Sequence, residues 1–526
     1  MRSTTDWGAA RKWIVIAAVG VLVAFLAAYV VALHFMAPKL RAMAREEVQD
    51  HLQEHFKSSV HFDDFDVTFY PRVHVVVYGL VMRHKGRTDI PPLIQVRRVS
   101  FYATLTSLLR DHPEIGVVEL DGLQIHTPPR TPGGPPLVHG TEQNLAEKYP
   151  IVIREIRADD ALLVLLRKDS DKPPNQFEIH HLVINNFAFD RPAAFHALLT
   201  NPKPRGYIHC DGQFGPWRAE EPSETPVSAN YTFFNADLGS IKGLRGTLSS
   251  TGKFSGPLDY LNVEGTTDTP DFGLRTAARS MALNTDFTAI VDGTNGDTVL
   301  TNVTAKFLHT TLVTHGEVVD IYPKIKGRTI ALDAVSHDAR IEDLLALAVK
   351  SDQPVMTGSA ELRTKILIPE RDEDLVDRLQ LDGQFGLGKV HFTSANVQGK
   401  VDSLSRRGQG QPKNEDISRQ ASDLSGRFKM ADGGIHFSDL SFGVEGAAID
   451  LTGSYNLDSG QLDFRGKLRL EAKLSQTMTG WKSVVLKPFN HFFEGKDGGT
   501  EIPIKITGTR EHPAFGPDFH DKQNAK

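Results

Sequence analysis

The segment Gln384-Phe-Gly-Leu-Gly-Lys389 comes nearest to a nucleotide-binding motif in this chain. In a phosphate-binding loop, glycine backbone N–H groups and one lysine hold phosphate oxygens. That loop has four residues between its glycines and Ser or Thr after its lysine. Gly386 and Gly388 are separated by one residue, and Val390 follows the lysine. Nucleotide binding is therefore not predicted.

Metal-ligating residues are present, but their spacing does not fit a site. Asp292 and Asp297 flank a turn-like Gly-Thr-Asn-Gly sequence with too few carboxylates for calcium, and a hairpin turn is predicted instead. His180 and His181 are adjacent in an expected strand, so their side chains point to opposite faces and cannot share one metal. Cys210 is the single cysteine, which excludes internal disulfides and thiolate-rich metal sites. No metal and no cofactor are predicted.

Catalytic signatures are missing as well. The chain contains no His-Glu-x-x-His or Gly-x-Ser-x-Gly motif, and its carboxylates form no pair that suggests glycoside chemistry. A net charge of -6 and a pI near 6.4 argue against a nucleic-acid partner, which calls for a basic face. We expect no catalytic residues and no enzymatic activity.

The elements that organise the chain begin with an apolar segment at residues 14–36, after a tail at residues 1–13. The segment carries no charge and would be about 35 Å long as a helix, enough to cross a hydrocarbon core of about 30 Å. It is longer than the apolar region of a signal peptide, and no small-x-small cleavage site precedes Ala37. It is therefore predicted to be an uncleaved transmembrane helix. Lysine and arginine are balanced on its two sides, so charge does not set its orientation.

An amphipathic helix is predicted over 37–57, and beyond it apolar residues recur with period two. The predicted strand Gln461–Leu470 shows this best, because its apolar and charged residues alternate; Thr298–Phe307 is another. The apolar residues of the first strand are Leu462, Phe464, Leu468 and Leu470, and its charged residues are Asp463, Arg465, Lys467 and Arg469. This pattern predicts a mainly β body.

The segments between the predicted strands are typical of turns and short helices. Asp-Gly or Asn-Gly turns are predicted at 121–122, 295–296, 382–383 and 432–434, and short helices at 103–110, 192–200, 338–350 and 475–487. The words Asp211–Gly215 and 382–386 are identical, and looser Gly-x-Phe copies at 252–254 and 426–428 favour a body built from repeated strand units. The polar segment 403–422 is expected to be disordered.

The C-terminal region 423–518 resembles the bacterial AsmA-like family, and a tail at 519–526 follows it. The resemblance rests on these motifs: Leu-Ser-Gly-Arg-Phe-Lys-Met-Ala-Asp-Gly-Gly (424–434), Leu-Thr-Gly-Ser-Tyr-Asn-Leu (451–457), Gly-Lys-Leu-Arg-Leu (466–470), Leu-Ser-Gln-Thr (474–477), Leu-Lys-Pro-Phe-Asn-His-Phe-Phe (486–493) and Ile-Pro-Ile-Lys-Ile-Thr-Gly-Thr (502–509). These motifs are structural, made of strands and turns, and specify no reaction.

The resemblance implies a single-pass protein of the bacterial inner membrane with a cytoplasmic N-terminus and its body in the periplasm. It implies that residues 58–402 and 423–518 form a long curved antiparallel β-sheet, a groove with few short helices, like that of bridge-like lipid-transfer proteins. The expected partners are phospholipid or another lipid, the inner membrane, and envelope or outer-membrane proteins. The expected function is lipid transfer or support of outer-membrane assembly, with Leu462, Phe464, Leu468 and Leu470 facing lipid. The alternative is a membrane-tethered scaffold with a closed β core, because alternation marks a sandwich core as readily as a groove.

Overall fold

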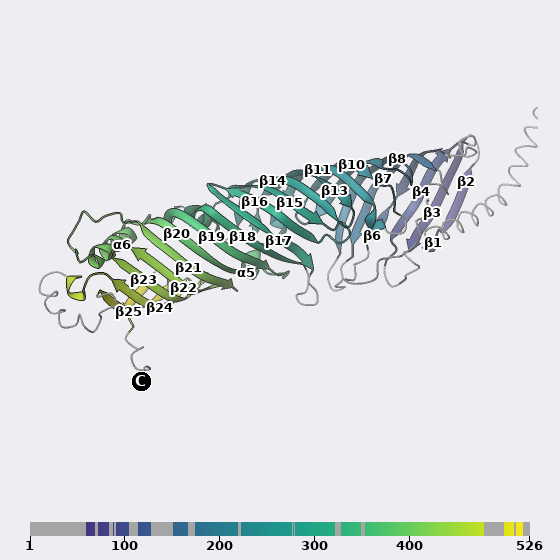
Figure 1. The fold of residues 1–526 in the computed structure, drawn as a ribbon. Coiled ribbons are helices and arrows are strands. Elements are labelled where there is room, and N and C mark those ends of the chain that lie inside the picture. Colours follow the sequence, from purple (N-terminus) through teal and green to yellow (C-terminus); the bar gives the residue numbers. More distant parts are fainter. Residues whose placement is uncertain are drawn as a thin grey trace, which may run out of the picture.

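The molecule is one long sheet of strands, seen in a computed structural model as a single twisted layer (Figure 1). The structure describes residues 59–68, 72–83, 88, 91–104, 114–127, 151–166, 174–218, 222–275, 277, 279–320, 328–348, 353–477, 499–509 and 512–518. Twenty-six strands belong to the sheet. The expectation of a mainly β body is confirmed.

We divide the sheet into three sections. The N-terminal section contains β1 (Ser59–His61), β2 (Asp64–Thr68), β3 (Val73–Arg83), β4 (Ile94–Ala103), β5 (Glu114–Asp121), β6 (Gln124–Thr127), β7 (Val152–Leu165), β8 (Asn175–Phe187), β9 (Ala193–Pro202), β10 (Arg205–Phe214) and β11 (Pro226–Asp237). The middle section contains β12 (Leu244–Arg245), β13 (Thr247–Pro257), β14 (Leu261–Leu274), β15 (Met281–Val291), β16 (Thr298–Phe307), β17 (Thr310–Asp320), β18 (Arg328–Arg340) and β19 (Met356–Ile368). The C-terminal section contains β20 (Gln380–Phe392), β21 (Ser422–Ala431), β22 (Gly434–Val444), β23 (Ala447–Asn456), β24 (Gln461–Leu470), β25 (Thr500–Thr509) and β26 (Pro513–Pro517).

The helices of the described residues are short and lie at the ends of strands. The α-helices are α4 (Ile341–Ala348), α5 (Leu375–Arg378) and α6 (Ala395–Gly408), and the 3₁₀ turns are η2 (Pro222–Glu224), η3 (Leu238–Ser240) and η4 (Leu474–Gln476). The predicted helix at 338–350 corresponds to α4. The predicted helix at 192–200 is wrong, because this segment forms β9, where Phe195, Ala197 and Leu199 alternate with period two.

The strands form an antiparallel meander with one parallel step. From β7 onward each long strand pairs with the next long strand in sequence, and β5 and β6 pair with β7 in parallel. Three pairs of strands lie end to end and share a position: β1 with β2 beside β3, β5 with β6 beside β7, and β12 with β13 beside β14. The sheet therefore has twenty-three positions from its first edge to its last.

Side chains on the two faces of the sheet differ in type. In β15, Met281, Leu283 and Phe287 lie on one face, which we call the apolar face, while Asn284 and Asp286 lie on the other, the polar face. The same alternation continues through neighbouring strands, because residues in register share a face. Within the described ranges there is one sheet, so no second sheet packs on the apolar face.

Several predicted boundaries agree with the structure. The predicted strands Gln461–Leu470 and Thr298–Phe307 have the same bounds as β24 and β16. The turns at 121–122, 295–296 and 432–434 join strands, and each contains a glycine with positive φ. The turn predicted at Asp382-Gly383 is wrong, because both residues lie inside β20 and pair there with β19 and β21.

The segment 403–422, expected to be disordered, contains the second half of α6, a hydrogen-bonded loop and the start of β21. Val401 and Ser405 of α6 are buried, and the Asp402 carboxylate accepts hydrogen bonds from the backbone N–H groups of Arg419 and Gln420. These few buried residues and hydrogen bonds therefore give a polar segment a defined structure.

The predicted N-terminal elements are not covered by the structure. The tail 1–13, the transmembrane helix 14–36, the amphipathic helix 37–57 and the tail 519–526 lie outside the described residues. Among the residues that are described, no helix is both long and apolar enough to cross a membrane.

Candidate functional site

The structure brings the four sequence-nominated residues of β24 to the apolar face. Phe464 and Leu470 are buried, with 6% and 7% of their surfaces exposed. Leu462 and Leu468 are partly exposed. The buried residues Phe464 and Leu470 form the packed layer under this face, which we call its floor. Leu462 and Leu468 can touch a bound molecule.

The charged residues of β24 lie on the polar face and pair with neighbouring strands. Lys467 Nζ lies 2.8 Å from Glu501 of β25, and Arg469 pairs with Asp450 of β23. These side chains are mostly exposed, so the pairs lie on a solvated surface and stabilise the sheet only slightly. The alternation along β24 thus separates a wet face from an apolar one.

Aromatic rings form a continuous strip on the apolar face of the C-terminal section. Ring centroids lie 6.1 Å apart for Phe385 and Phe428, 6.4 Å for Phe385 and Phe437, and 5.8 Å for Phe437 and Phe464. Gly453 of β23 stands in register between Phe437 of β22 and Phe464 of β24. Because glycine has no side chain, the two rings meet above it, and the floor stays smooth.

The repeated Gly-x-Phe words have this structural role. In β20 and β21 the glycine and the phenylalanine of each word are two residues apart and share the apolar face. A Cβ placed on Gly426 would lie 3.3 Å from the Phe385 ring of the neighbouring strand. The repeat therefore encodes a ring lying over a cross-strand glycine.

The apolar face extends to the last strand, which sequence reasoning did not nominate. Ile506 of β25 pairs directly with Phe515 of β26, and Phe515 is 68% exposed. The signal was present, because Ile502, Ile504 and Ile506 alternate with period two. Phe515 ends the apolar strip on an open surface.

The backbone of β26 protects this edge of the sheet. Thr509 and His512 exchange backbone hydrogen bonds, and Asp518 N donates to Pro503 O. In an antiparallel ladder this register turns the backbone groups of Pro513, Phe515 and Pro517 outward. Proline has no N–H, so Phe515 keeps the one outward donor of the three. A further strand would pair poorly there.

The apolar face of the middle section carries hydroxyl groups. Ser250, Thr267 and Thr285 stand in one cross-strand row on β13, β14 and β15. Thr267 Oγ1 lies 2.7 Å from Thr285 Oγ1, and the Tyr231 hydroxyl lies 3.2 Å from Ser250 Oγ. Burial raises the pKa of Tyr231, so it stays a neutral hydroxyl at physiological pH.

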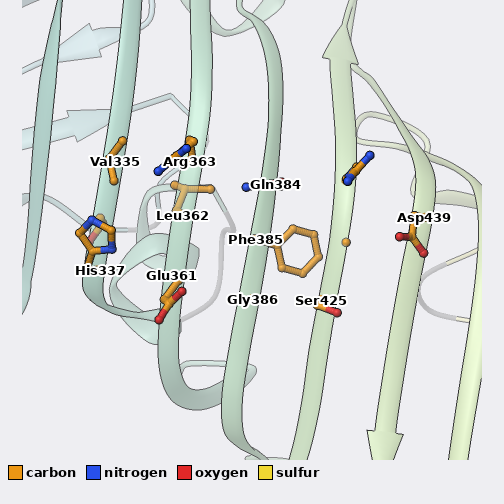
Figure 2. A pocket seen from close by; sticks show the side chains of 13 residues that line it. Val335, His337, Glu361, Leu362, Arg363, Gln384, Phe385, Gly386, Ser425 and Asp439 are labelled. Carbon is orange, nitrogen blue, oxygen red and sulfur yellow. The ribbon is translucent and has the colours of Figure 1, made fainter.

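A depression of about 420 Å³ crosses β18 to β22 (Figure 2). Glu361, Arg363 and Gln384 line it, together with Arg427 and Asp439, and all five are exposed polar-face residues. In Figure 2 the labelled side chains of Glu361, Arg363, Gln384 and Asp439 come from neighbouring strands and do not converge on one point. Exposed charges of both signs are typical of a solvated face, and they do not define a ligand site.

Other residues considered for chemistry have structural partners. His181 Nδ1 lies 2.6 Å from Asp159 Oδ1, and His180 Nε2 lies 2.6 Å from Thr200 Oγ1, so the two rings have separate contacts. Asp292 accepts hydrogen bonds from Thr294 and Asn295 within the predicted hairpin turn. No group of three metal-ligating side chains occurs within the described part of the chain.

Cys210 lies on the apolar face of β10, opposite Ala197 of β9 and Tyr231 of β11. Burial raises the pKa of the Cys210 thiol to about 11. The thiol is therefore protonated at neutral pH and lacks the thiolate that nucleophilic chemistry needs.

No family model and no curated protein matches this chain in sequence.

Proposed function

We propose that this chain shields the acyl chains of phospholipid, or of another lipid, on the apolar face of its sheet and carries the lipid away from the membrane that anchors it. The observation that carries the proposal is the partial exposure of the apolar face, which no second sheet formed by the described residues covers. Leu462, Leu468 and Phe515 are all on this face and all accessible. A closed sandwich core would bury such residues, so their exposure supports an open face over the scaffold alternative.

The length of the face suits a lipid track. Twenty-three strand positions about 4.8 Å apart make a path of roughly 105 Å along the sheet. Each CH₂ removed from water gains about 0.8 kcal/mol, so an acyl chain is held by continuous apolar contact without a closed pocket. The resemblance of residues 423–518 to the AsmA-like family supports the same role in a bacterial envelope, with the body in the periplasm and the inner membrane as the lipid source.

Site-specific photo-crosslinking tests the proposal. A photoreactive residue at Leu462, expressed in the full chain, should capture phospholipid in native membranes. The same residue at Arg465 is the matched control, because it lies three residues away in the same strand on the polar face. We expect labelling at Leu462 and none at Arg465. Equal labelling at both positions, or none at Leu462, Leu468 and Ile504 in folded protein, overturns the proposal.

Phe464 is less suitable as a probe position than Leu462 or Leu468. Phe464 is the most conspicuous apolar residue of β24 in the sequence, but its ring packs against Phe437 and 6% of its surface is exposed. A probe there would disturb the floor before it met lipid. Leu462 and Leu468 avoid this problem.

A further inference from the structure

Two opposite margins of the sheet meet in the middle section. The first margin carries the ends of β14 and β18 at residues 274 and 340, and the second carries the end of β19 at residue 368. In the meander these margins lie at opposite ends of the strands. A flat sheet would separate the end of β14 from the end of β19 by roughly 50 Å, given five strand intervals and a 13-residue strand.

Instead, the two margins are in hydrogen-bond contact. Leu375 N donates to Lys242 O over 3.0 Å, and Lys242 Nζ donates to Asp372 O over 2.7 Å. Arg275 Nε lies 3.0 Å from Asp374 Oδ2, and its NH2 group lies 2.6 Å from Asp377 Oδ1. We call this set the latch: Lys242, Gly243 and Arg275 on one margin and Asp372, Asp374, Leu375 and Asp377 on the other.

The latch means that the sheet coils into a closed curve between β14 and β19. The apolar face is the inner one, because its residues are shielded although the described strands form a single sheet; Ala334 is 1% exposed, Thr364 5% and Thr314 8%. Helix α4 lies on this face, where Leu344 and Leu345 pack against the cluster of Ala339, Ala360 and Leu387. Asp343 of α4 accepts hydrogen bonds from His309 N and Thr310 Oγ1, which fixes the helix there.

The coiled section leaves little surface inside for a ligand. Ala334, Thr314 and Thr364 on its inner face are almost fully shielded, so an acyl chain finds little to contact there while the margins are joined. The N-terminal and C-terminal sections have no such closure among their described residues. A lipid moving along the apolar face from one end section to the other therefore meets an obstruction at the latch.

The latch consists of few contacts. The Arg275 and Asp377 side chains are 49% and 47% exposed, so water screens this pair, and the pair of Arg275 with Asp374, which is 18% exposed, is the stronger of the two. Gly243 has φ +92, a conformation that glycine adopts without strain, and a Cβ there would lie 2.2 Å from Asp374 Oδ1. These few polar contacts join the segment before β12 and Arg275 to the short helix α5 and its N-cap, so they can open without disturbing the ladder of strands.

We infer that the middle section is a gate on the lipid track, held shut by the contacts of Arg275 with Asp374 and Asp377. This inference rests on the proposed function, because a gate needs a track. Separating the two margins uncoils β14 to β19 and joins the apolar faces of the end sections into one path.

A disulfide across the latch tests the gate. The changes are Lys242→Cys and Leu375→Cys in a Cys210→Ala background, so that no other thiol is present. The backbones of residues 242 and 375 are hydrogen-bonded, so the two positions are adjacent, as a disulfide requires. Two reporter chains carry a photoreactive residue at Ile208 in the N-terminal section or at Leu462 in the C-terminal section. Each is placed as the full chain in membranes that contain radiolabelled phospholipid.

In the oxidised protein, labelling at Leu462 should fall about tenfold while labelling at Ile208 is unchanged, and reduction should restore it. The two single-cysteine variants are matched controls and should label equally with and without reductant. Equal labelling at Leu462 in the oxidised and reduced forms overturns the gate and leaves the lipid track standing. Failure of both reporters to label in the reduced form overturns the proposed function itself.

The opposite change gives an independent check. Arg275→Gln removes both ion pairs, so labelling at Leu462 should rise about two- to fivefold in the chain without the disulfide. Arg245→Gln is the matched control, because Arg245 is a neighbouring arginine that donates to Ala277 O and makes no contact across the margins. An equal response of the two variants contradicts the latch.

Discussion

The middle and C-terminal sections share the same strand pattern but differ in what lies on their apolar face. In the C-terminal section, rings from Phe385, Phe437 and Phe464 meet over glycines and make a dry floor. In the middle section, the corresponding face carries hydroxyl groups at Ser250, Thr267, Thr269, Thr285, Thr314, Ser336 and Thr364. The coiled middle section thus combines apolar residues with small hydroxyl-bearing ones on its inner face, whereas the C-terminal section has neighbouring aromatic rings there.

The margins of the two sections differ in the same way. In the C-terminal section, α6 is tied to the sheet margin by buried groups, with Asp402 and Ser405 both shielded from solvent. In the middle section, the latch depends on a half-exposed arginine. The C-terminal margin is therefore held by buried contacts and the middle margin by more exposed ones, which is the difference that the proposed gate requires.

The largest expected effect is on the C-terminal floor. Phe464→Ala should destabilise β23 to β25 by about 3 kcal/mol, because it removes a buried ring and leaves a cavity under Phe437. Phe287→Ala in the middle section should cost about 1–2 kcal/mol, since this ring is already partly exposed. Amide hydrogen exchange measured strand by strand is the appropriate readout, because strands that contact mainly their neighbours need not unfold together.

The control for this comparison is Arg465→Ala, which should change the same amides by less than about 0.5 kcal/mol because its side chain lies on the polar face. Equal effects at Phe464 and Phe287 would show that the two floors are packed alike.

Glycines of the C-terminal section test how closely its strands approach. A Cβ on Gly466 would lie 1.8 Å from the backbone oxygen of Asp450, so Gly466→Ala should destabilise β23 and β24 by about 2 kcal/mol. A Cβ on Gly386 would meet no atom within 4 Å, so Gly386→Ala should be neutral within about 0.5 kcal/mol. The stability of both variants can be measured by thermal unfolding, with limited proteolysis as the readout. A neutral Gly466→Ala would mean that β23 and β24 can move apart enough to accommodate the added methyl group.

Much of the strand layout could be predicted from the sequence, because alternation is a local signal. The bounds of β24 follow from four charged residues set between apolar ones. The burial of Phe464 could not be predicted, since it depends on register with Gly453 and Phe437 on other strands. The Asp-Gly signal at 382–383 failed for a similar reason, because tertiary pairing overrode a local turn preference.

The latch was out of reach of sequence reasoning. Arg275 and Asp377 are 102 residues apart, and they meet because the intervening strands coil. Coiling involves six strands together, and no single motif reports it. The order of segment 403–422 was missed because the composition shows few apolar residues there, whereas the segment is held by hydrogen bonds to one buried carboxylate, Asp402.

Asp402 provides a test of how firmly α6 is held at the margin of the C-terminal section, which we call the fixed wall. Burial alone would raise the pKa of Asp402, but hydrogen bonds from Gln420, Gln398 and Arg419, with the charge of Arg406, outweigh it and lower the pKa. A lowered folded-state pKa contributes stability above the unfolded value of about 3.9 and loses it as pH falls further. Exchange protection of the Arg419 and Gln420 amides should therefore be constant from pH 7 to 5 and fall below about pH 4.

The matched variant is Asp402→Asn, which keeps the shape but removes the charge. It should lower protection of the two amides by about 1–2 kcal/mol at pH 7 and abolish the decline below pH 4. The latch should behave differently, because its exposed pairs respond to salt: 0.5 M NaCl should loosen the latch and leave α6 in place. An equal response to salt at both margins would remove the distinction between wall and latch.

The smallest expected effect concerns the hydroxyl row of the middle section. Thr267 and Thr285 share a 2.7 Å hydrogen bond on the apolar face. Thr267→Val should cost about 1 kcal/mol, because it leaves the partner hydroxyl without its hydrogen bond while keeping the side-chain shape. Thr285→Val should cost the same. The double variant should lie close to the wild type, since both polar groups then disappear together, which gives a coupling of about 2 kcal/mol in a double-mutant cycle. The measurement is exchange protection in β14 and β15.

The pair Thr288 and Thr301 on the polar face, also 2.7 Å apart, is the matched control, because water can replace either partner there and its coupling should be near zero. Additive effects at Thr267 and Thr285 would show that water reaches this part of the inner face as freely as the outer one, and the coiled middle section would then be as open as the C-terminal floor.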